Sequence, residues 1–439
     1  MVLGSGERVP GVRRVAVLRA NALGDYLVAV PALEALRAAY PDAEVVLLGT
    51  PLHAELLAGR PGPVDRVAVV PPSPGVRDPG ADAEADRWAL EAFFAAMVAE
   101  RFDLAVQLHG GGRWSNPFLR RLGARLTVGL RTPDAALLDR WVPYVYYQHE
   151  VLRFLEVVAL VGAAPVGLDP RLTVTAADRA AATAALTGAG AGAGAGAGVG
   201  AGVGAGAGGV PLVALHPGAT DPRRRWPVDR FAAVGDALAD AGAAVLVTGG
   251  AGERDLVDGV RSRMRRPAAG LAGALSLSAL VGVLERCAVV VANDTGPRHL
   301  AAAVGTATVS VYWCGNLVNA GPLTRTRHRP HVSWRTRCPV CGVDATEPDE
   351  PPREPAGCEH TDSFVADVPV GPVRDDALDL LGSGVAAVAQ RPRRHPPAPT
   401  PRRAYVRAGS TPNTLAMSSM TCAAPWRLTD SIQTSAETS

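Results

Sequence analysis

The feature of this sequence that most constrains its fold is a recurring unit, in which a short apolar run ends in a turn and a helical pattern follows. The runs have the near-continuous apolar character of strands that are buried on both faces of a sheet. In the first half they are residues 14–19, 43–49, 66–70 and 103–108. Helical spacing follows the first run, with Pro31 either in the first turn or at a kink, and residues 88–100 have helix-forming composition. This alternation predicts an open parallel sheet covered by helices.

The second half repeats the pattern, and a length of 439 residues suits two domains of middling size. Its apolar runs are residues 211–218, 243–250, 288–296 and 307–315. Residues 188–209 contain only Gly, Ala and Val, and such a segment cannot specify a core. We therefore expect an N-terminal Rossmann-like domain over 13–175, a linker over 176–210 and a second Rossmann-like domain over 211–385. From about residue 390 the hydrophobic period ends, which predicts a disordered tail over 390–439.

The composition excludes several classes of protein. A formal charge of +2 gives no electrostatic reason to bind nucleic acid, although all 44 cationic residues are arginines. The first residues lack the apolar core of a signal peptide, and no run has the hydrophobicity of a membrane span, so we expect a cytoplasmic protein. The six cysteines do not indicate a secreted disulfide framework.

The segment AVVVANDTGPRHLAAAVG, residues 288–305, indicates a ligand site. An apolar strand passes through the polar turn 293–296 into a helix, whose first N–H groups lack partners inside the helix. These groups and the positive end of the helix dipole attract phosphate, which predicts a nucleotide diphosphate at the carboxyl end of a sheet. The alternative is that Asp294 only caps the helix.

Three further positions carry a functional and a structural interpretation each. The segment LHPGATDPRRRWP, residues 215–227, places arginines where they can clamp a diphosphate, although arginine runs are more often only solvated. Glu253 follows a strand ending in two glycines and can accept both ribose hydroxyls, or can instead be a partner of the helix dipole. Asp25 follows Gly24 after the first strand and is either a general base or a helix cap.

Taken in order, these segments resemble glycosyltransferase family 9, the heptosyltransferases that move a heptose from ADP-heptose to the inner core of lipopolysaccharide. The resemblance spans about residues 13–385 and is carried by three segments: RVAVLRANALGDYLVAVPALEALRAAYP, HPGATDPRRRWPVDRF and ANDTGPRHLAAAVG. It implies a GT-B architecture, in which two Rossmann-like domains face each other across a cleft and the second domain holds most of the donor nucleotide.

The resemblance also implies roles for individual residues. Asp25 takes the position of the catalytic base, and no cofactor is implied. The donor contacts, with Arg225 added from the arginine cluster, are Thr220, Arg224, Arg225, Glu253, Asp294, Thr295, Gly296 and His299. The chain departs from the family pattern at Arg224, where Lys is usual, and again after Gly305, where Asn316 and Asn319 stand in a segment that commonly contains Phe-Gly.

Four other residues have the chemistry of a structural zinc site. They are Cys338, Cys341, Cys358 and His360, although the second pair is more closely spaced than in an ordinary zinc knuckle. We expect no catalytic metal.

We therefore expect an inverting, metal-independent glycosyltransferase that transfers a sugar, heptose by resemblance, from an ADP-sugar to a glycan or glycolipid acceptor. Such an acceptor implies a peripheral contact with the inner membrane face, and we expect a monomer. Two alternatives remain open: a GT-B nucleotide-sugar epimerase, and a non-catalytic nucleotide-sugar-binding or scaffold protein.

Overall fold

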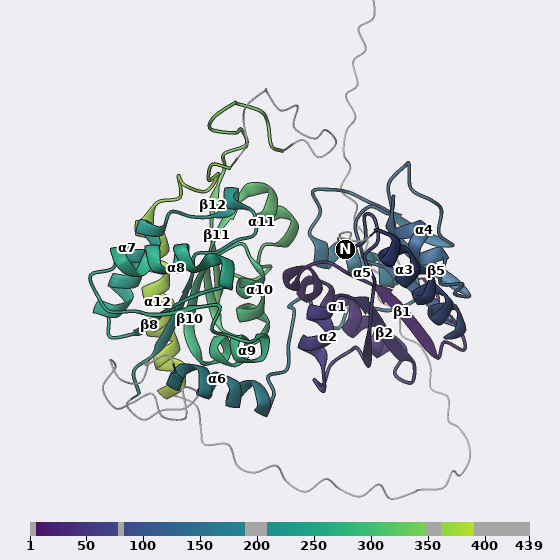
Figure 1. The fold of residues 1–439 in the computed structure, drawn as a ribbon, viewed down its shortest axis with the longest axis horizontal. Helices are drawn as coiled ribbons and strands as arrows, with labels where there is room; N and C mark the ends of the chain where they lie inside the picture. Colours follow the sequence, from purple (N-terminus) through teal and green to yellow (C-terminus); the bar gives the residue numbers. More distant parts are fainter. Residues whose placement is uncertain (1–5, 78–82, 189–208, 347–360, 390–439) are drawn as a thin grey trace, which may run out of the picture. The chain divides into compact units, whose positions relative to one another are not determined.

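The computed structural model describes residues 6–77, 83–188, 209–346 and 361–389. The predicted disordered tail and almost all of the Gly/Ala run at 188–209 lie outside these residues, so those two predictions stay predictions. The described part contains two six-stranded sheets, and every strand pair in both sheets is parallel (Figure 1). The predicted α/β fold class is confirmed.

The first sheet has the strand order β3-β2-β1-β4-β5-β6. Its strands are β1 (Arg14–Leu18), β2 (Glu44–Gly49), β3 (Arg66–Val69), β4 (Leu104–Gln107), β5 (Leu126–Arg131) and β6 (Arg140–Pro143). Its helices are α1 (Leu23–Ala39), α2 (Pro51–Leu57), α3 (Ala83–Ala99), α4 (Ser115–Arg120) and α5 (Glu150–Ala159). Pro31 lies within α1, well beyond its first turn.

Alternate residues of each strand enter different cores, because successive side chains point to opposite faces of a sheet. In β1, Val15 and Val17 belong to the core that contains α1 and α5, whereas Ala16 and Leu18 belong to the core beneath α3 and α4. The sheet is therefore covered on both faces, which explains why its central strands have no polar side.

The second sheet has the order β12-β11-β10-β7-β8-β9. Its strands are β7 (Leu212–His216), β8 (Ala244–Gly249), β9 (Ala269–Ala272), β10 (Cys287–Asn293), β11 (Ala307–Trp313) and β12 (His328–Ser333). Its helices are α6 (Ala176–Gly188), α7 (Val228–Asp240), α8 (Arg254–Arg263), α9 (Leu277–Arg286), α10 (Gly296–Ala303), α11 (Cys314–Ala320) and α12 (Val370–Ala389). In Figure 1, α7, α8 and α12 cover one face of this sheet and α9 and α10 the other.

Four strands were not identified in the sequence analysis. Three of them, β6, β9 and β12, are edge strands, which need less apolar sequence because they have a neighbour on one side only. The edge position also tolerates Pro330 within β12. The fourth, β5, is interrupted by Gly129, where a Cβ would lie 2.6 Å from the Cβ of Gln107.

Helix α6, which the sequence analysis placed at the start of the linker, packs on α9. Their close approach depends on Gly282, because a Cβ there would lie 2.2 Å from the carbonyl oxygen of Asp178. Asp178 is also buried and accepts hydrogen bonds from the guanidinium of Arg60. No helix in the described ranges has both the length and the apolar character needed to cross a membrane.

We predict that Gly282→Ala lowers the free energy of unfolding by about 1–3 kcal/mol, because the new methyl group meets backbone that cannot move aside. The urea midpoint measures this change. Gly382→Ala is the matched control, since that glycine lies on the exposed side of α12 with open space around it. An unchanged midpoint for Gly282→Ala would show that α6 and α9 pack less closely than described.

Candidate active site

The strand order places a crevice in each sheet. In the first sheet the chain leaves β1 toward one side and β4 toward the other, and in the second sheet β7 and β10 do the same. Open α/β sheets bind ligands outside the carboxyl ends of strands at such switch points. Asp25 follows β1, Thr220 follows β7 and Asp294 follows β10, so the predicted site residues occupy these crevices.

A cavity of about 230 Å³ brings residues of the two halves together. The predicted site residues that line it are Asp25, Thr220, Arg224, Asp294, Thr295, Gly296 and His299. An adjoining cavity of about 400 Å³ shares Thr220, Thr295 and Gly296 and adds Glu253. Arg225 lines neither cavity, because its Nε donates a hydrogen bond to the carbonyl oxygen of Ala219 at 2.9 Å. Arg225 therefore stabilises the loop after β7 and faces neither cavity.

Asp294 is the most heavily bonded carboxylate of the site, with a side chain only 5 % exposed. Its Oδ1 lies 3.2 Å from Nε2 of His299, and its Oδ2 accepts from Nδ2 of Asn316 at 2.8 Å and from Arg224 at 3.4 Å. Burial by itself would raise the pKa of Asp294. The hydrogen bond from His299 and the charges of Arg224 and Arg298 outweigh burial and hold that pKa below its ordinary value.

The orientation of the His299 ring follows from its neighbours. Nη1 of Arg298 lies 3.1 Å from Nδ1 of His299, and because a guanidinium can only donate, Nδ1 must be the acceptor. Nε2 then faces Asp294 as the donor. Arg298 thus orients the ring of His299 toward the carboxylate.

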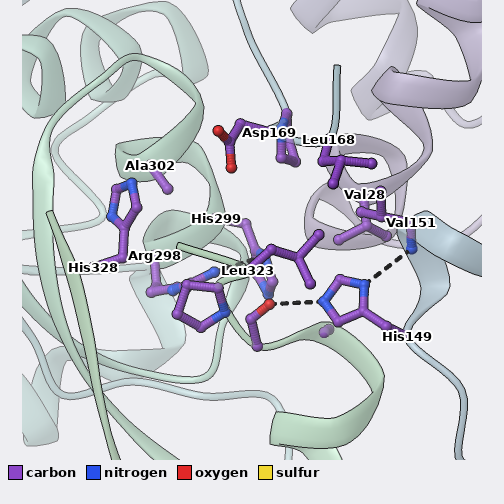
Figure 2. Close-up of a pocket in the computed structure, with 14 residues that line it drawn as sticks. Val28, His149, Val151, Leu168, Asp169, Arg298, His299, Ala302, Leu323 and His328 are labelled. Atoms are coloured by element: carbon purple, nitrogen blue, oxygen red, sulfur yellow. Dashed lines mark hydrogen bonds between the residues drawn. The ribbon is translucent and has the colours of Figure 1, made fainter. Parts of the chain in front are cut away.

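A smaller cavity of about 40 Å³ lies beside this group and shares Val28, His299 and Ala320 with the main cavity. Figure 2 shows His149 approaching it from the α5 side and Arg298 and His299 from α10. Nε2 of His149 lies 2.7 Å from the carbonyl oxygen of Gly321 and ties the start of α5 to the end of α11. Burial lowers the pKa of His149, so this link is made by a neutral ring.

The first turn of α10 has the features of an anion site. Its N-cap, Thr295, has extended backbone with φ −157°, and no side chain of the described residues caps the helix. Thr295 and Gly296 line the cavity that Arg224 also lines, whereas Pro297 has no N–H and the N–H groups of Arg298 and His299 donate to the carbonyl oxygen of Thr295. The Nε of Arg224 is buried and has no hydrogen-bond partner in the described part of the chain. A helix N-terminus and a guanidinium that face one cavity suit a diphosphate.

Asp25 is both a cap of helix α1 and a carboxylate that reaches the cavity. Its Oδ2 accepts from the backbone N–H of Ala22, the N-cap residue of α1, at 3.0 Å, so Asp25 caps the start of the helix from its first turn. Its Oδ1 lies 3.0 Å from Nη2 of Arg19, which is 2.7 Å from Glu150. The side chain of Asp25 is nevertheless 38 % exposed, whereas that of Arg19 is 3 % exposed. The carboxylate is therefore held in place and still reaches the cavity.

Glu253 is likewise positioned by its backbone neighbours. It ends the short helix η2 (Ala251–Glu253), and its Oε2 accepts from the N–H of Gly250 at 2.8 Å. Gly218 allows this position, because a Cβ there would lie 2.0 Å from Oε1 of Glu253. His216 lies beneath, 3.9 Å from Oε2, and its burial lowers the pKa of the ring. Glu253 thus accepts a hydrogen bond at the start of the short helix and also lines the adjoining cavity.

Three polar residues that line the main cavity were not assigned a role from the sequence. Glu150 lies 131 positions from Arg19 in the chain, and no local pattern marks it. Asn316 and Asn319 stand in the segment that departs from the family pattern, and that departure was the available signal.

The predicted zinc site stays a prediction. Cys338 is buried and Cys341 half-buried, whereas Cys358 and His360 lie outside the described residues. Among the residues that the structure does describe, no three His, Cys, Asp or Glu side chains are grouped to hold a metal ion.

The chain belongs to glycosyltransferase family 9 (heptosyltransferase), whose family model matches residues 90–336. Lipooligosaccharide heptosyltransferase 2 of Haemophilus influenzae is 32% identical over 110 residues, which are 24% of this chain and 32% of that protein. The chain therefore matches about a third of the length of this curated relative.

Solved structures match over more of the chain. The ADP-heptose lipopolysaccharide heptosyltransferase II of E. coli has a TM-score of 0.61 at 18% identity, covering 84% of this chain and 99% of that one. An E. coli heptosyltransferase solved with ADP-2-deoxy-2-fluoro heptose has a TM-score of 0.52 at 20% identity, covering 72% and 92%. At these identities the likeness shows the fold, and it confirms the predicted GT-B architecture.

Stability also depends on pH through His109, which lies outside the cavities and whose Nδ1 accepts from the N–H of Ala20 at 3.3 Å. Burial, and then the charge of Arg19, lowers the pKa of His109 to about 4. Below pH 6.5 the unfolded chain therefore binds a proton that the folded chain does not bind until about pH 4. We predict that this histidine removes about 2 kcal/mol of stability between pH 7 and pH 5.

Urea midpoints of the native chain and of His109→Asn at pH 7 and pH 5 measure this contribution. Asn can present an oxygen near the place of Nδ1 but has no charge to gain, so the variant should lose less stability on acidification. Equal losses in both proteins would contradict the assigned shift.

Proposed function

We propose that this protein is an inverting, metal-independent glycosyltransferase that transfers a sugar, heptose by family membership, from an ADP-sugar to a glycan or glycolipid acceptor. The observation that carries the proposal is that Asp25 and the group formed by Asp294, Thr295 and Gly296 line the same cavity. One half of the chain contributes a carboxylate and the other half an anion site. This is the minimum that a transfer between an acceptor hydroxyl and a nucleotide sugar requires.

The donor half of the proposal rests on Arg224 and α10. Both face the cavity, and together they supply the positive charge that a leaving diphosphate needs, which is the role a divalent cation has in other transferases. Glu253 lies in the adjoining cavity, at a place suited to ribose hydroxyls. The E. coli relative solved with an ADP-sugar analogue supports the choice of ADP.

The acceptor half rests on Asp25. In the proposed reaction, the acceptor oxygen forms a bond to the anomeric carbon while the bond from that carbon to the diphosphate oxygen breaks. The acceptor proton passes to Asp25, and ADP leaves with the electron pair. A single displacement inverts the configuration at the anomeric carbon. Arg19, which also pairs with Glu150, holds Asp25 without covering it.

The same assay separates this proposal from its alternatives. Release of ADP that depends on an acceptor supports transfer. An altered nucleotide sugar formed from donor alone would indicate an epimerase, and tight binding without any turnover would indicate a binding protein.

We predict that Asp25→Asn lowers turnover about 10²- to 10⁴-fold while ADP affinity and stability stay near normal, because the amide keeps the shape but cannot take the proton. ADP release from ADP-heptose with an inner-core lipopolysaccharide acceptor measures turnover. Glu150→Gln is the matched comparison, since Glu150 lines the same cavity and bonds the same arginine. If Glu150→Gln loses the larger factor, the base is Glu150 instead.

We also predict that ADP raises the melting temperature equally with and without chelator, and that Arg224→Ala weakens ADP binding by about 1.5–3 kcal/mol. Isothermal titration of ADP measures the affinity. Arg223→Ala is the control, because Arg223 pairs with Asp221 at 2.7 Å and does not line the cavity. Binding that disappears in chelator, or an equal loss in both variants, would count against a diphosphate held by Arg224.

A further inference from the structure

The side chain of His149 makes hydrogen bonds in both halves of the chain. His149 is the N-cap of α5 in the first half, where its Nδ1 accepts from the backbone N–H of Val151 at 3.2 Å. Its Nε2 lies 2.7 Å from the carbonyl oxygen of Gly321, the C-cap of α11 in the second half, and Figure 2 shows both bonds. Because a carbonyl oxygen only accepts, Nε2 is the donor and the ring is in its neutral form.

Capping alone does not account for a histidine at this position. Ser, Thr, Asp and Asn are the usual N-cap residues, and their polar atoms reach no farther from the backbone than Nδ1 of a histidine does. None of them could also make the bond that Nε2 makes with Gly321. The link between α5 and α11 is therefore what His149 adds to an ordinary cap.

The link joins the two helices that position Asp294 and Asp25. On the side of the second half, α11 carries Asn316, whose Nδ2 donates to Asp294 at 2.8 Å. On the side of the first half, α5 begins with Glu150, which lies 2.7 Å from Nη2 of Arg19, and the same Nη2 lies 3.0 Å from Asp25. Helix α5 also packs on α1, whose first turn contains Asp25. The placement of each carboxylate thus depends on one of the two linked helices.

We propose that His149 is a positioning residue for the transfer reaction. Its bond to Gly321 fixes α5 against α11, and the contacts of Glu150 carry that placement to Asp25. The base and the anion site are then held at the separation that a displacement between them requires. This inference rests on the proposed function, because it assumes that Asp25 is the base and that the diphosphate binds at α10.

Two substitutions separate the link from the cap, because Asn places an amide near Nδ1 of histidine and Gln places one near Nε2. His149→Asn keeps the cap and loses the link, so kcat for ADP release from ADP-heptose with an inner-core lipopolysaccharide acceptor should fall about ten- to hundredfold. Its ADP affinity, measured by isothermal titration, should stay within about twofold of native. His149→Gln keeps the link and loses the cap, so its urea midpoint should fall while kcat stays within about threefold of native. A native kcat in His149→Asn, or an equal loss of kcat in both variants, overturns the role of the link.

A double variant tests whether His149 acts through Asp25. Added to Asp25→Asn, the substitution His149→Asn should lower kcat by no more than about twofold further, because the base that it positions is already lost. A further loss as large as that of His149→Asn alone would show that His149 acts by another route and overturns the proposal.

Tyr147→Phe is the matched control, because it removes another hydrogen bond between the two halves, from the hydroxyl of Tyr147 to the carbonyl oxygen of Thr346 at 2.6 Å. Its kcat should stay within about twofold of native. A loss equal to that of His149→Asn would show that any contact between the halves has this effect, which overturns a particular role for His149. Failure of the proposed function differs from all of these outcomes, since the native chain itself would then release no ADP with donor and acceptor, and both proposals would fall.

Discussion

The close approach of α1 and α10 is the contact on which the site depends. A Cβ at Gly24 would lie 3.1 Å from the ring of His299, and a Cβ at Gly296 would lie 3.4 Å from the Cβ of Leu23. Glycine at both positions lets the first turns of two helices meet. Each helix brings the positive end of its dipole, so the space between them favours anions before any side chain is considered.

The side chains around this contact are ordered by one another rather than by a ligand. Arg19 holds Asp25 and Glu150 from below, and Arg298 holds His299, which holds Asp294. Charges fixed in this way need little rearrangement when a diphosphate departs, and such preorganisation is a large part of catalysis in most enzymes. The cost is a buried Arg298 whose Nη2 has no partner in the described part of the chain.

The two halves have the same arrangement of central strands and differ in the residues that follow those strands. Each has a switch point between two neighbouring central strands, β1 and β4 in one sheet and β7 and β10 in the other. After β1 the chain supplies a carboxylate that reaches the cavity, and after β10 it supplies an uncapped helix. The proposed division into a base on one side and a donor site on the other thus arises from short loops on a repeated scaffold.

The sequence by itself determined the parts of the protein that local patterns encode. Central strands such as β10 are buried on both faces and so are continuously apolar, and the motif around Asp294 combines a strand end with a helix start. Edge strands such as β12, and the pairing of Arg19 with Glu150 across 131 positions, carry no such pattern. Only the tertiary structure decided where those strands and that ion pair lie. It also decided that Arg225 bonds to Ala219 and that Asn319 lines the cavity. Such contacts depend on which distant segments the two sheets bring together.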